Sequence, residues 1–167
     1  NNLLAAGSND QHVYVFDVNG KLKWKHKAEY KIEYVAWSSN GLLAAGSWIG
    51  NIYVFDANGN LKWKYKAGGT IECMAWSSSG LLAAGCCNGY VYVFDADGKL
   101  KWKSRTGDDV VCIDWSNNDV LAVGNEYAGL YVFDCTLTCT LAFSNVFDGF
   151  YFYVDNVKYS GNNITLG

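Results

Sequence analysis

Hydrophobic and polar residues alternate most clearly in residues 21–27, which read Lys-Leu-Lys-Trp-Lys-His-Lys. Successive side chains of a β-strand point to opposite faces of its sheet, so this alternation predicts a strand with one inward and one solvated face. The solvated face is all lysine, and lysine on an edge strand opposes pairing with the edge of another sheet. We therefore expect this segment to be the outermost strand of a sheet.

The same pattern returns in a repeat of 39 residues, whose units begin at Leu3, Leu42, Leu81 and Val120. A period of this length is typical of solenoids and propellers, in which each unit buries its apolar faces against its neighbours. The residues that mark the repeat are Gly7, Gly46, Gly85 and Gly124; Tyr14, Tyr53, Tyr92 and Tyr131; Asp17, Asp56, Asp95 and Asp134; Trp24, Trp63 and Trp102; and Trp37, Trp76 and Trp115.

Each unit divides into four short strands separated by turn residues. In the best-defined unit we expect strands at residues 71–77, 81–85, 91–95 and 99–105. The apolar run at 81–85 shows no alternation, which fits a strand buried on both sides, and Asp97-Gly98 suits a tight hairpin turn between the last two strands. The layout is typical of a propeller blade whose strands run in order from the central axis to the rim.

We therefore predict an all-β fold, a single β-propeller domain over residues 1–167 with four-stranded antiparallel blades. The repeats cover approximately residues 3–41, 42–80, 81–119 and 120–158, and residues 135–167 form a degenerate last blade. About four blades are present. They would make a partial ring, a closed four-bladed ring or half of a larger assembly, and the last arrangement predicts a homodimer.

Two families of propellers resemble this repeat over residues 3–134. Residues 35–47, VAWSSNGLLAAGS, and residues 51–56, NIYVFD, resemble a WD repeat, with Phe-Asp where that family closes a strand in Trp-Asp. Residues 91–103, VYVFDADGKLKWK, are similar to the repeat of quinoprotein-type (PQQ-like) propellers, which match at Asp95, Gly98, Lys99 and Trp102. The Gly-His pair of many WD repeats is missing, so the histidine-centred network of that family is not expected here.

Composition and charge narrow the possible partners. The chain is 50% hydrophobic, has no proline and carries 13 basic against 16 acidic residues, for a net charge of −3. No apolar run approaches the roughly 20 residues of a membrane-spanning helix, so we expect no membrane insertion. Eleven of the basic residues fall on the outer strands, where edge protection explains them, and we expect no nucleic-acid binding.

The cysteines and histidines do not have the spacing of a metal site. There are six cysteines but no Cys-x-x-Cys pair, and His12 and His26 are the only histidines. Cys135 and Cys139 lie four residues apart on one expected strand, so their Cα atoms would be roughly 13 Å apart, beyond the reach of a disulfide. Unpaired thiols favour a reducing compartment, so the cytoplasm is favoured over export while the localisation stays open.

Candidate catalytic and cofactor residues are also missing from the sequence. Asp17, Asp56 and Asp95 precede Asn-Gly or Asp-Gly as in a Ca²⁺ loop, but no later acidic residue completes a ligand set, which favours a turn. No Ser-His-Asp or Cys-His set and no phosphate loop occurs. We therefore expect no enzyme activity, no cofactor and no metal.

The residues that vary between repeats gather in the connection between the second and third strands and in the connection between the fourth strand and the next unit. In a four-stranded antiparallel blade both connections lie at the same end, so they would build one face. We predict that this face binds a protein or peptide partner, with aromatic residues as anchors. The expected contact residues are Tyr30, Trp48, Ile49, Cys86, Cys87, Tyr90, Asp108, Asp109, Glu126 and Tyr127.

The leading functional hypothesis is thus a non-enzymatic propeller scaffold that binds a partner through its loop face. An alternative from another class is an extracellular or periplasmic structural propeller of the PQQ-like kind. A quinone-dependent dehydrogenase ranks last, because no Trp at a central channel with convergent Arg and carboxylate groups is visible.

Overall fold

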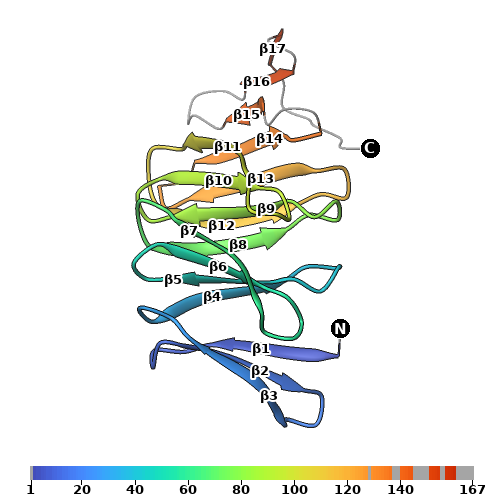
Figure 1. Cartoon of the computed structure of the whole chain (residues 1–167). Helices are drawn as coiled ribbons and strands as arrows, with labels where there is room; N and C mark the ends of the chain where they lie inside the picture. Colours follow the sequence, from blue (N-terminus) through green and yellow to red (C-terminus); the bar gives the residue numbers. More distant parts are fainter. Residues whose placement is uncertain (1, 128, 137–139, 145–150, 155–156, 161–167) are drawn as a thin grey trace.

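The computed structural model describes residues 2–127, 129–136, 140–144, 151–154 and 157–160, the last three ranges as backbone only. Every regular element in these ranges is a β-strand, and the strands form four antiparallel sheets that follow one another from the N-terminal to the C-terminal end of the molecule (Figure 1). No helix in the described residues has the length and apolar character that crossing a membrane requires. The predicted all-β fold is confirmed.

The two middle sheets are complete blades. The second sheet contains β4 (Ile32–Trp37), β5 (Leu43–Ser47), β6 (Asn51–Phe55) and β7 (Leu61–Lys66), hydrogen-bonded in chain order. The third contains β8 (Ile71–Trp76), β9 (Leu82–Cys86), β10 (Tyr90–Phe94) and β11 (Leu100–Arg105), again in chain order. β4 and β8 pack against each other at the inner edge, whereas the lysine-bearing β7 and β11 lie at the outer edge, as the alternation predicts.

The two terminal sheets depart from this plan. The first has only three strands, β1 (Leu3–Gly7), β2 (His12–Asp17) and β3 (Leu22–Lys27), so β1 is its inner edge. The fourth has six strands in chain order. They are β12 (Val110–Trp115), β13 (Val120–Asn125), β14 (Leu130–Asp134), β15 (Thr140–Ser144), β16 (Tyr151–Val154) and β17 (Val157–Ser160).

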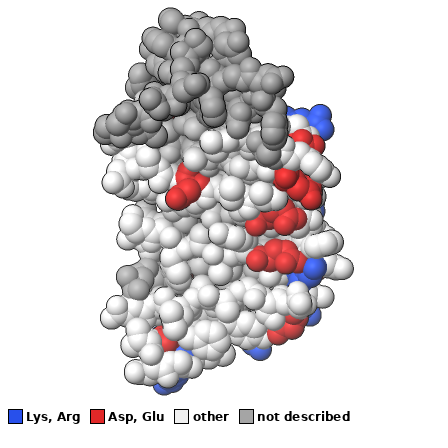
Figure 2. All heavy atoms as spheres, turned by 180° about the vertical axis from the view of Figure 1, so that it is seen from behind, with Lys and Arg blue, Asp and Glu red and all other residues white. Residues whose placement is uncertain are grey.

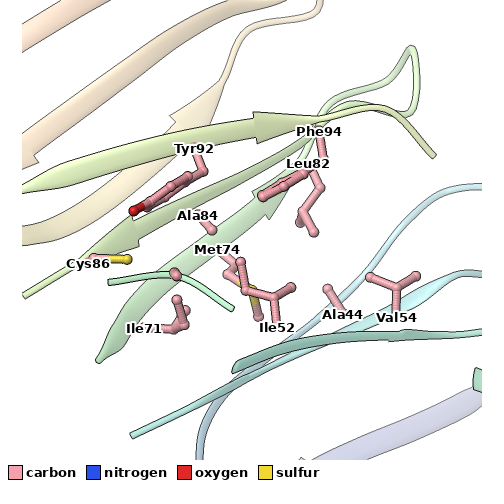
Figure 3. Close-up of a cluster of buried hydrophobic side chains, with 11 residues drawn as sticks. Ala44, Ile52, Val54, Ile71, Met74, Leu82, Ala84, Cys86, Tyr92 and Phe94 are labelled. Atoms are coloured by element: carbon pink, nitrogen blue, oxygen red, sulfur yellow. The ribbon is translucent and has the colours of Figure 1, made fainter. Parts of the chain in front are cut away.

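The core lies between the sheets. In the layer between the second and third sheets, Ile52 and Val54 of β6 meet Leu82 of β9 and Phe94 of β10, and all four side chains are fully buried (Figure 3). The alternation along each strand sends one set of side chains to the preceding sheet and the other set to the following sheet. A middle sheet is therefore buried on both faces, which is why its second strand is apolar throughout.

Glycine allows the sheets to approach closely. A Cβ atom on Gly46 of β5 would lie 2.5 Å from Cγ2 of Ile71 in the next sheet, and one on Gly85 would lie 2.4 Å from Cγ1 of Val110. Real side chains do not tolerate such distances, so only glycine fits at this repeat position. The marker glycines thus secure the spacing between blades.

Tryptophans link neighbouring sheets at both edges. Trp76 Nε1 donates to the Ala36 carbonyl oxygen at 3.2 Å, and Trp115 Nε1 donates to that of Ala75 at 3.0 Å. At the outer edge, Trp24 and Trp63 donate to carbonyl oxygens in the third-to-fourth strand turn of the following sheet. These tryptophans therefore pack between neighbouring sheets and add a hydrogen bond across the boundary.

The marker aspartates serve the tight turns between the third and fourth strands. Asp56 Oδ1 accepts hydrogen bonds from the backbone N–H groups of Asn58, at 2.9 Å, and Asn60, at 3.0 Å. Gly59 between them has a φ of 89°, a conformation that L side chains rarely adopt. These carboxylates are therefore engaged in turn formation, as the sequence predicts.

One expectation about the cysteines is wrong. Cys135 is disulfide-bonded. The argument against a bond with Cys139 placed both residues on one strand, but β14 ends at Asp134 and β15 begins at Thr140. Cys135 therefore lies beyond the end of β14, where the extended-strand distance does not apply, and Cys139 lies outside the described residues.

Candidate functional site

The two variable connections lie at the same end of each blade. In the second sheet, the Trp48 backbone N–H donates to the Lys31 carbonyl oxygen at 3.1 Å. The Ala67 backbone N–H donates to the Gly50 carbonyl oxygen at 2.8 Å. The equivalent bonds run from Cys87 to Thr70 in the third sheet and from Glu126 to Asp109 in the fourth. We call the surface formed by residues 28–31, 33, 47–50, 67–70, 72, 86–89, 106–109 and 125–127 the loop face.

Tyrosines at the marker position hold the loop face in place. The Tyr53 hydroxyl accepts from the Glu29 backbone N–H at 3.4 Å, and that of Tyr92 accepts from Gly68 at 3.4 Å. Tyr131 donates to the Thr106 carbonyl oxygen at 2.6 Å. In each case the connection that leads into a blade is fixed by the third strand of that blade.

Tyr14 is at the same position in the first sheet, where the described residues include no preceding connection. Its hydroxyl donates instead to Asp10 Oδ2 at 2.5 Å. That hydrogen bond is the main reason that the pKa of Asp10 falls to about 2. The marker tyrosine of the first sheet thus also has a hydrogen-bond partner, but this partner is only four residues away in the chain.

The predicted aromatic anchors are exposed on the loop face. Tyr30 retains 42%, Trp48 47% and Tyr127 72% of its accessible surface. Ile49 and Cys87 are half-buried beside them. Tyr90 is also half-buried, at the start of β10, and the cationic groups of Lys103 and Arg105 lie 5.7 and 6.0 Å from its ring centre.

Lys31 and Trp48 form the best-defined contact of the face. Lys31 Nζ lies 3.7 Å from the centre of the Trp48 ring and 2.7 Å from Glu33 Oε1. A cation over an indole face is attracted by the negative charge of the ring, and a nearby carboxylate adds to this attraction. The loop face therefore already holds one ammonium group between an aromatic ring and a carboxylate.

Carboxylates continue from this contact across successive sheets. Glu33 of β4 and Glu72 of β8 occupy the same repeat position, and Asp109 lies at the entry to β12. Burial, and then the negative charges of Asp109 and Glu33, raise the pKa of Glu72, which Lys31 only partly offsets. Acidic residues accordingly gather along one side of the molecule over several sheets (Figure 2).

The remaining predicted acidic residues lie on the same face. Asp108 and Glu126 are exposed, and Asp109 is half-buried. Together with Glu33 and Glu72 they make the loop face negative, whereas most of the basic side chains lie on the outer strands. The face has excess negative charge beside exposed aromatic rings.

Cys86 is wrong as a contact residue. It is the last residue of β9, its side chain is fully buried between the second and third sheets, and burial raises its pKa to about 12 (Figure 3). The same repeat position holds Ser47 and Asn125, which are also buried and whose side-chain oxygens accept backbone N–H groups of the following turn. The position belongs to the end of a strand rather than to an exposed loop.

Sequence reasoning missed Lys31, Glu33 and Glu72. Glu33 and Glu72 are the second residues of β4 and β8, inner strands that were assigned wholly to the scaffold, and Lys31 directly precedes β4. The signal was present, because Glu recurs at one repeat position in two units while the neighbouring positions are apolar. An acidic residue at a fixed place on an inner strand could have been recognised as part of the face.

The described residues contain no group of three or more His, Cys, Asp or Glu side chains arranged to hold a metal ion. On the loop face, the described residues expose aromatic rings and carboxylates.

Comparison with known proteins gives a family match and a set of similar folds. The family model described as anaphase-promoting complex subunit 4 WD40 domain matches residues 1–79 and 40–118. A search of the curated proteins finds no match. Similar solved structures include a chain of the mitotic checkpoint complex, with a TM-score of 0.78 and 18% identity over 90% of this chain and 49% of that one.

Two structures of Sqt1 from Chaetomium thermophilum are also similar. One has a TM-score of 0.79 and 20% identity over 86% of this chain and 42% of that one. The other, bound to the N-terminus of the ribosomal protein L10, has a TM-score of 0.77 and 22% identity over 86% of this chain and 46% of that one. The chain thus spans less than half the length of the solved structures that it resembles.

Proposed function

Because the chain belongs to the family of the anaphase-promoting complex subunit 4 WD40 domain, we propose that it is a non-enzymatic scaffold that binds a protein or peptide through its loop face. The WD-repeat β-propeller is the shared architecture. The similar Sqt1 structure bound to the N-terminus of a ribosomal protein supports a peptide as one form of partner.

The observation that carries the proposal is the combination of exposed aromatic rings and uncompensated carboxylates on one face. Exposed Trp and Tyr residues are frequent anchors of protein interfaces. Burial raises the pKa of Glu72, and the negative charges of Asp109 and Glu33 raise it further, so a cation from a partner would be attracted there. The partner segment that fits best is therefore basic.

Lys31 illustrates how such a segment would bind. Its ammonium group lies over Trp48 and against Glu33, whereas no cation is paired with Glu72 within the described residues. A lysine or arginine of the partner would lie between Glu72 and Asp109, with its aliphatic stem against the exposed aromatic rings. Both the attraction of the cation to the two carboxylates and the packing of the stem against the rings would increase the affinity.

An array of short peptides that differ in lysine and arginine content, at constant aromatic content, tests this proposal. We expect binding to rise with basic content and Glu72→Lys to weaken it by about tenfold or more. The matched control is Asp97→Lys, which makes the same change of charge in an exposed turn outside the loop face. Equal loss in both variants, or no preference for basic peptides, would contradict the proposal.

The pH dependence has a definite sign. A basic segment binds the ionised form of Glu72, whose pKa is raised above its ordinary value. The affinity for a basic segment should therefore be highest at neutral pH, and it should fall as the pH drops through the raised pKa of Glu72. Titration of binding against pH in the Glu72→Gln variant, which keeps the shape of the side chain, should remove that part of the dependence.

A further inference from the structure

The connection that enters the second sheet carries a carboxylate that the blade itself binds. Glu29 forms an ion pair with Lys64 of β7 and accepts a hydrogen bond from Asn51 Nδ2 at 3.0 Å. The hydrogen bond from Lys64, and then that from Asn51, lower the pKa of Glu29, and the charge of Lys66 lowers it further. The second blade therefore contains a carboxylate site that a side chain of the chain fills.

The third sheet repeats the cations of this site without the carboxylate. Lys103 and Arg105 of β11 hold the repeat positions of the two lysines that act on Glu29, whereas Gly68 holds the position of Glu29 itself. Both cationic side chains are exposed. Within the described residues, neither of them forms an ion pair.

The backbone of the two connections is the same, so only the side chain differs. The Glu29 N–H donates to the Tyr53 hydroxyl at 3.4 Å, and the Gly68 N–H donates to the Tyr92 hydroxyl at the same distance of 3.4 Å. A Cβ atom on Gly68 would lie 2.8 Å from Asn88 Nδ2 and 3.8 Å from the Tyr92 hydroxyl oxygen. Polar groups therefore surround the place from which the missing side chain would extend.

Asn88 provides the amide donor that Asn51 provides in the second blade. Tyr90 takes the repeat position of Asn51, and its backbone N–H donates to Asn88 Oδ1 at 3.3 Å. This bond fixes the Asn88 amide with its Nδ2 atom beside the connection, where it has no acceptor among the described residues. The Tyr90 ring lies 5.7 and 6.0 Å from the cationic groups of Lys103 and Arg105 and attracts both of them.

We propose that the side-chain carboxylate of a glutamate from a partner polypeptide binds here, against Lys103, Arg105 and the Asn88 amide. The second blade supports this chemistry, because cations at the same repeat positions and an amide group bind a glutamate there. Hydrogen bonds between such cations and a carboxylate are charge-assisted and strong. The site takes an acidic residue and uses neither Glu72 nor Asp109, so it does not rest on the function proposed above.

A partner explains the occupant better than the described chain does. Asp108 and Asp109 are the acidic residues nearest in sequence to Arg105, and neither is paired with it or with Lys103. The third sheet has all four of its strands and a neighbouring sheet on each side. The carboxylate is therefore missing because residue 68 is a glycine, and not because a strand or a sheet is missing.

The test titrates the ¹⁵N-labelled chain with the peptide acetyl-Gly-Glu-Gly-amide. Its neutral control is acetyl-Gly-Gln-Gly-amide, which has nearly the same shape. We expect the glutamate peptide to shift the resonances of the Asn88 side-chain amide and of the Arg105 Nε–H group. The glutamine peptide should need a concentration about tenfold or more higher for the same shift, because it lacks the charge.

Two substitutions exchange the filled and the unfilled site. Gly68→Glu supplies an internal carboxylate and should weaken binding at the third blade by about tenfold or more. Glu29→Gly empties the second blade, so the glutamate peptide should then also shift the Asn51 side-chain amide. Asn118→Glu adds the same charge as Gly68→Glu in an exposed turn between β12 and β13, and it should leave binding unchanged.

Four results would overturn the proposal. The first is an equal response to the two peptides, and the second is an equal loss in Gly68→Glu and Asn118→Glu. The third is a response of the Glu29→Gly variant at the second blade without one at the third, because a carboxylate of the chain itself would then occupy the third. The fourth is stronger binding of inorganic phosphate than of the glutamate peptide at the same resonances, because the occupant would then be a phosphate.

Discussion

The boundary between the second and third sheets and the outward side of the first sheet are built from the same repeat, yet they differ in burial. Leu82 and Phe94 are fully buried at the inner boundary. Leu4, the counterpart of Leu82, is 59% exposed, and Phe16, the counterpart of Phe94, is only partly buried. The difference shows that the local sequence determines the strand, whereas a neighbouring sheet determines what the strand contributes to stability.

The largest expected effect tests this difference at one repeat position. Leu82→Ala should lower the free energy of unfolding by about 2–5 kcal/mol, because it removes a fully buried side chain and leaves a cavity. Leu4→Ala should change it by less than about 0.5 kcal/mol, since that side chain is exposed. Urea unfolding of both variants measures the two values. Similar losses would mean that the outward side of the first sheet is covered.

Gly46 gives the next largest effect. Gly46→Ala should cost about 1–3 kcal/mol, because the new Cβ atom would meet Ile71 of the next sheet. Gly124 at the same position is in the last sheet of the described residues, and a Cβ atom there would meet only the Sγ atom of the exposed Cys112. Gly124→Ala should therefore cost less. Equal costs in thermal unfolding would indicate that backbone conformation, rather than the approach of the next sheet, requires glycine.

Tryptophan variants should give a smaller difference. Trp76→Phe removes an indole hydrogen bond to Ala36 and should cost about 0.5–1.5 kcal/mol beyond the lost packing. Trp37→Phe removes a buried N–H group that has no acceptor among the described residues, so only the packing loss should remain. Denaturant unfolding of the two variants measures the difference. A larger loss for Trp37→Phe would show that its N–H group has an acceptor.

The smallest effect concerns reactivity rather than stability. Burial raises the pKa of both Cys73 and Cys86 to about 12, whereas the Cys112 side chain is exposed. Iodoacetamide at neutral pH should therefore modify Cys112 well before Cys73 or Cys86, because only an accessible thiolate reacts. Mass spectrometry of the folded chain gives the order. Rapid modification of Cys86 would contradict its burial.

The repeat was sufficient to predict most of the fold. A spacing of 39 residues, lysine alternation on the outer strands and Asp-Gly turns predicted the strand order that β8 to β11 show. Burial of Cys86 could not be derived from its unit alone, since two adjacent cysteines resemble a loop. It becomes visible only when Ser47 and Asn125 at the same position are seen to end their strands.

Only part of the loop face was predicted, because some of its features depend on how neighbouring sheets lie together. Exposed Tyr30, Trp48 and Tyr127 lie in connections whose sequence varies, and variation is readable from the repeats. The contribution of Glu72 depends on the distance between blades, which brings Asp109 and Glu33 near it. No single unit of the sequence contains that information.

Hydrogen exchange of the backbone amides tests most directly the claim that burial between sheets, rather than strand formation, stabilises this chain. Under native conditions we predict the slowest exchange in β5, β6, β9 and β10, which are covered on both faces, and much faster exchange in β1. Equal protection of β1 and β9 would contradict the account, because it would require the first sheet to be covered as fully as the third.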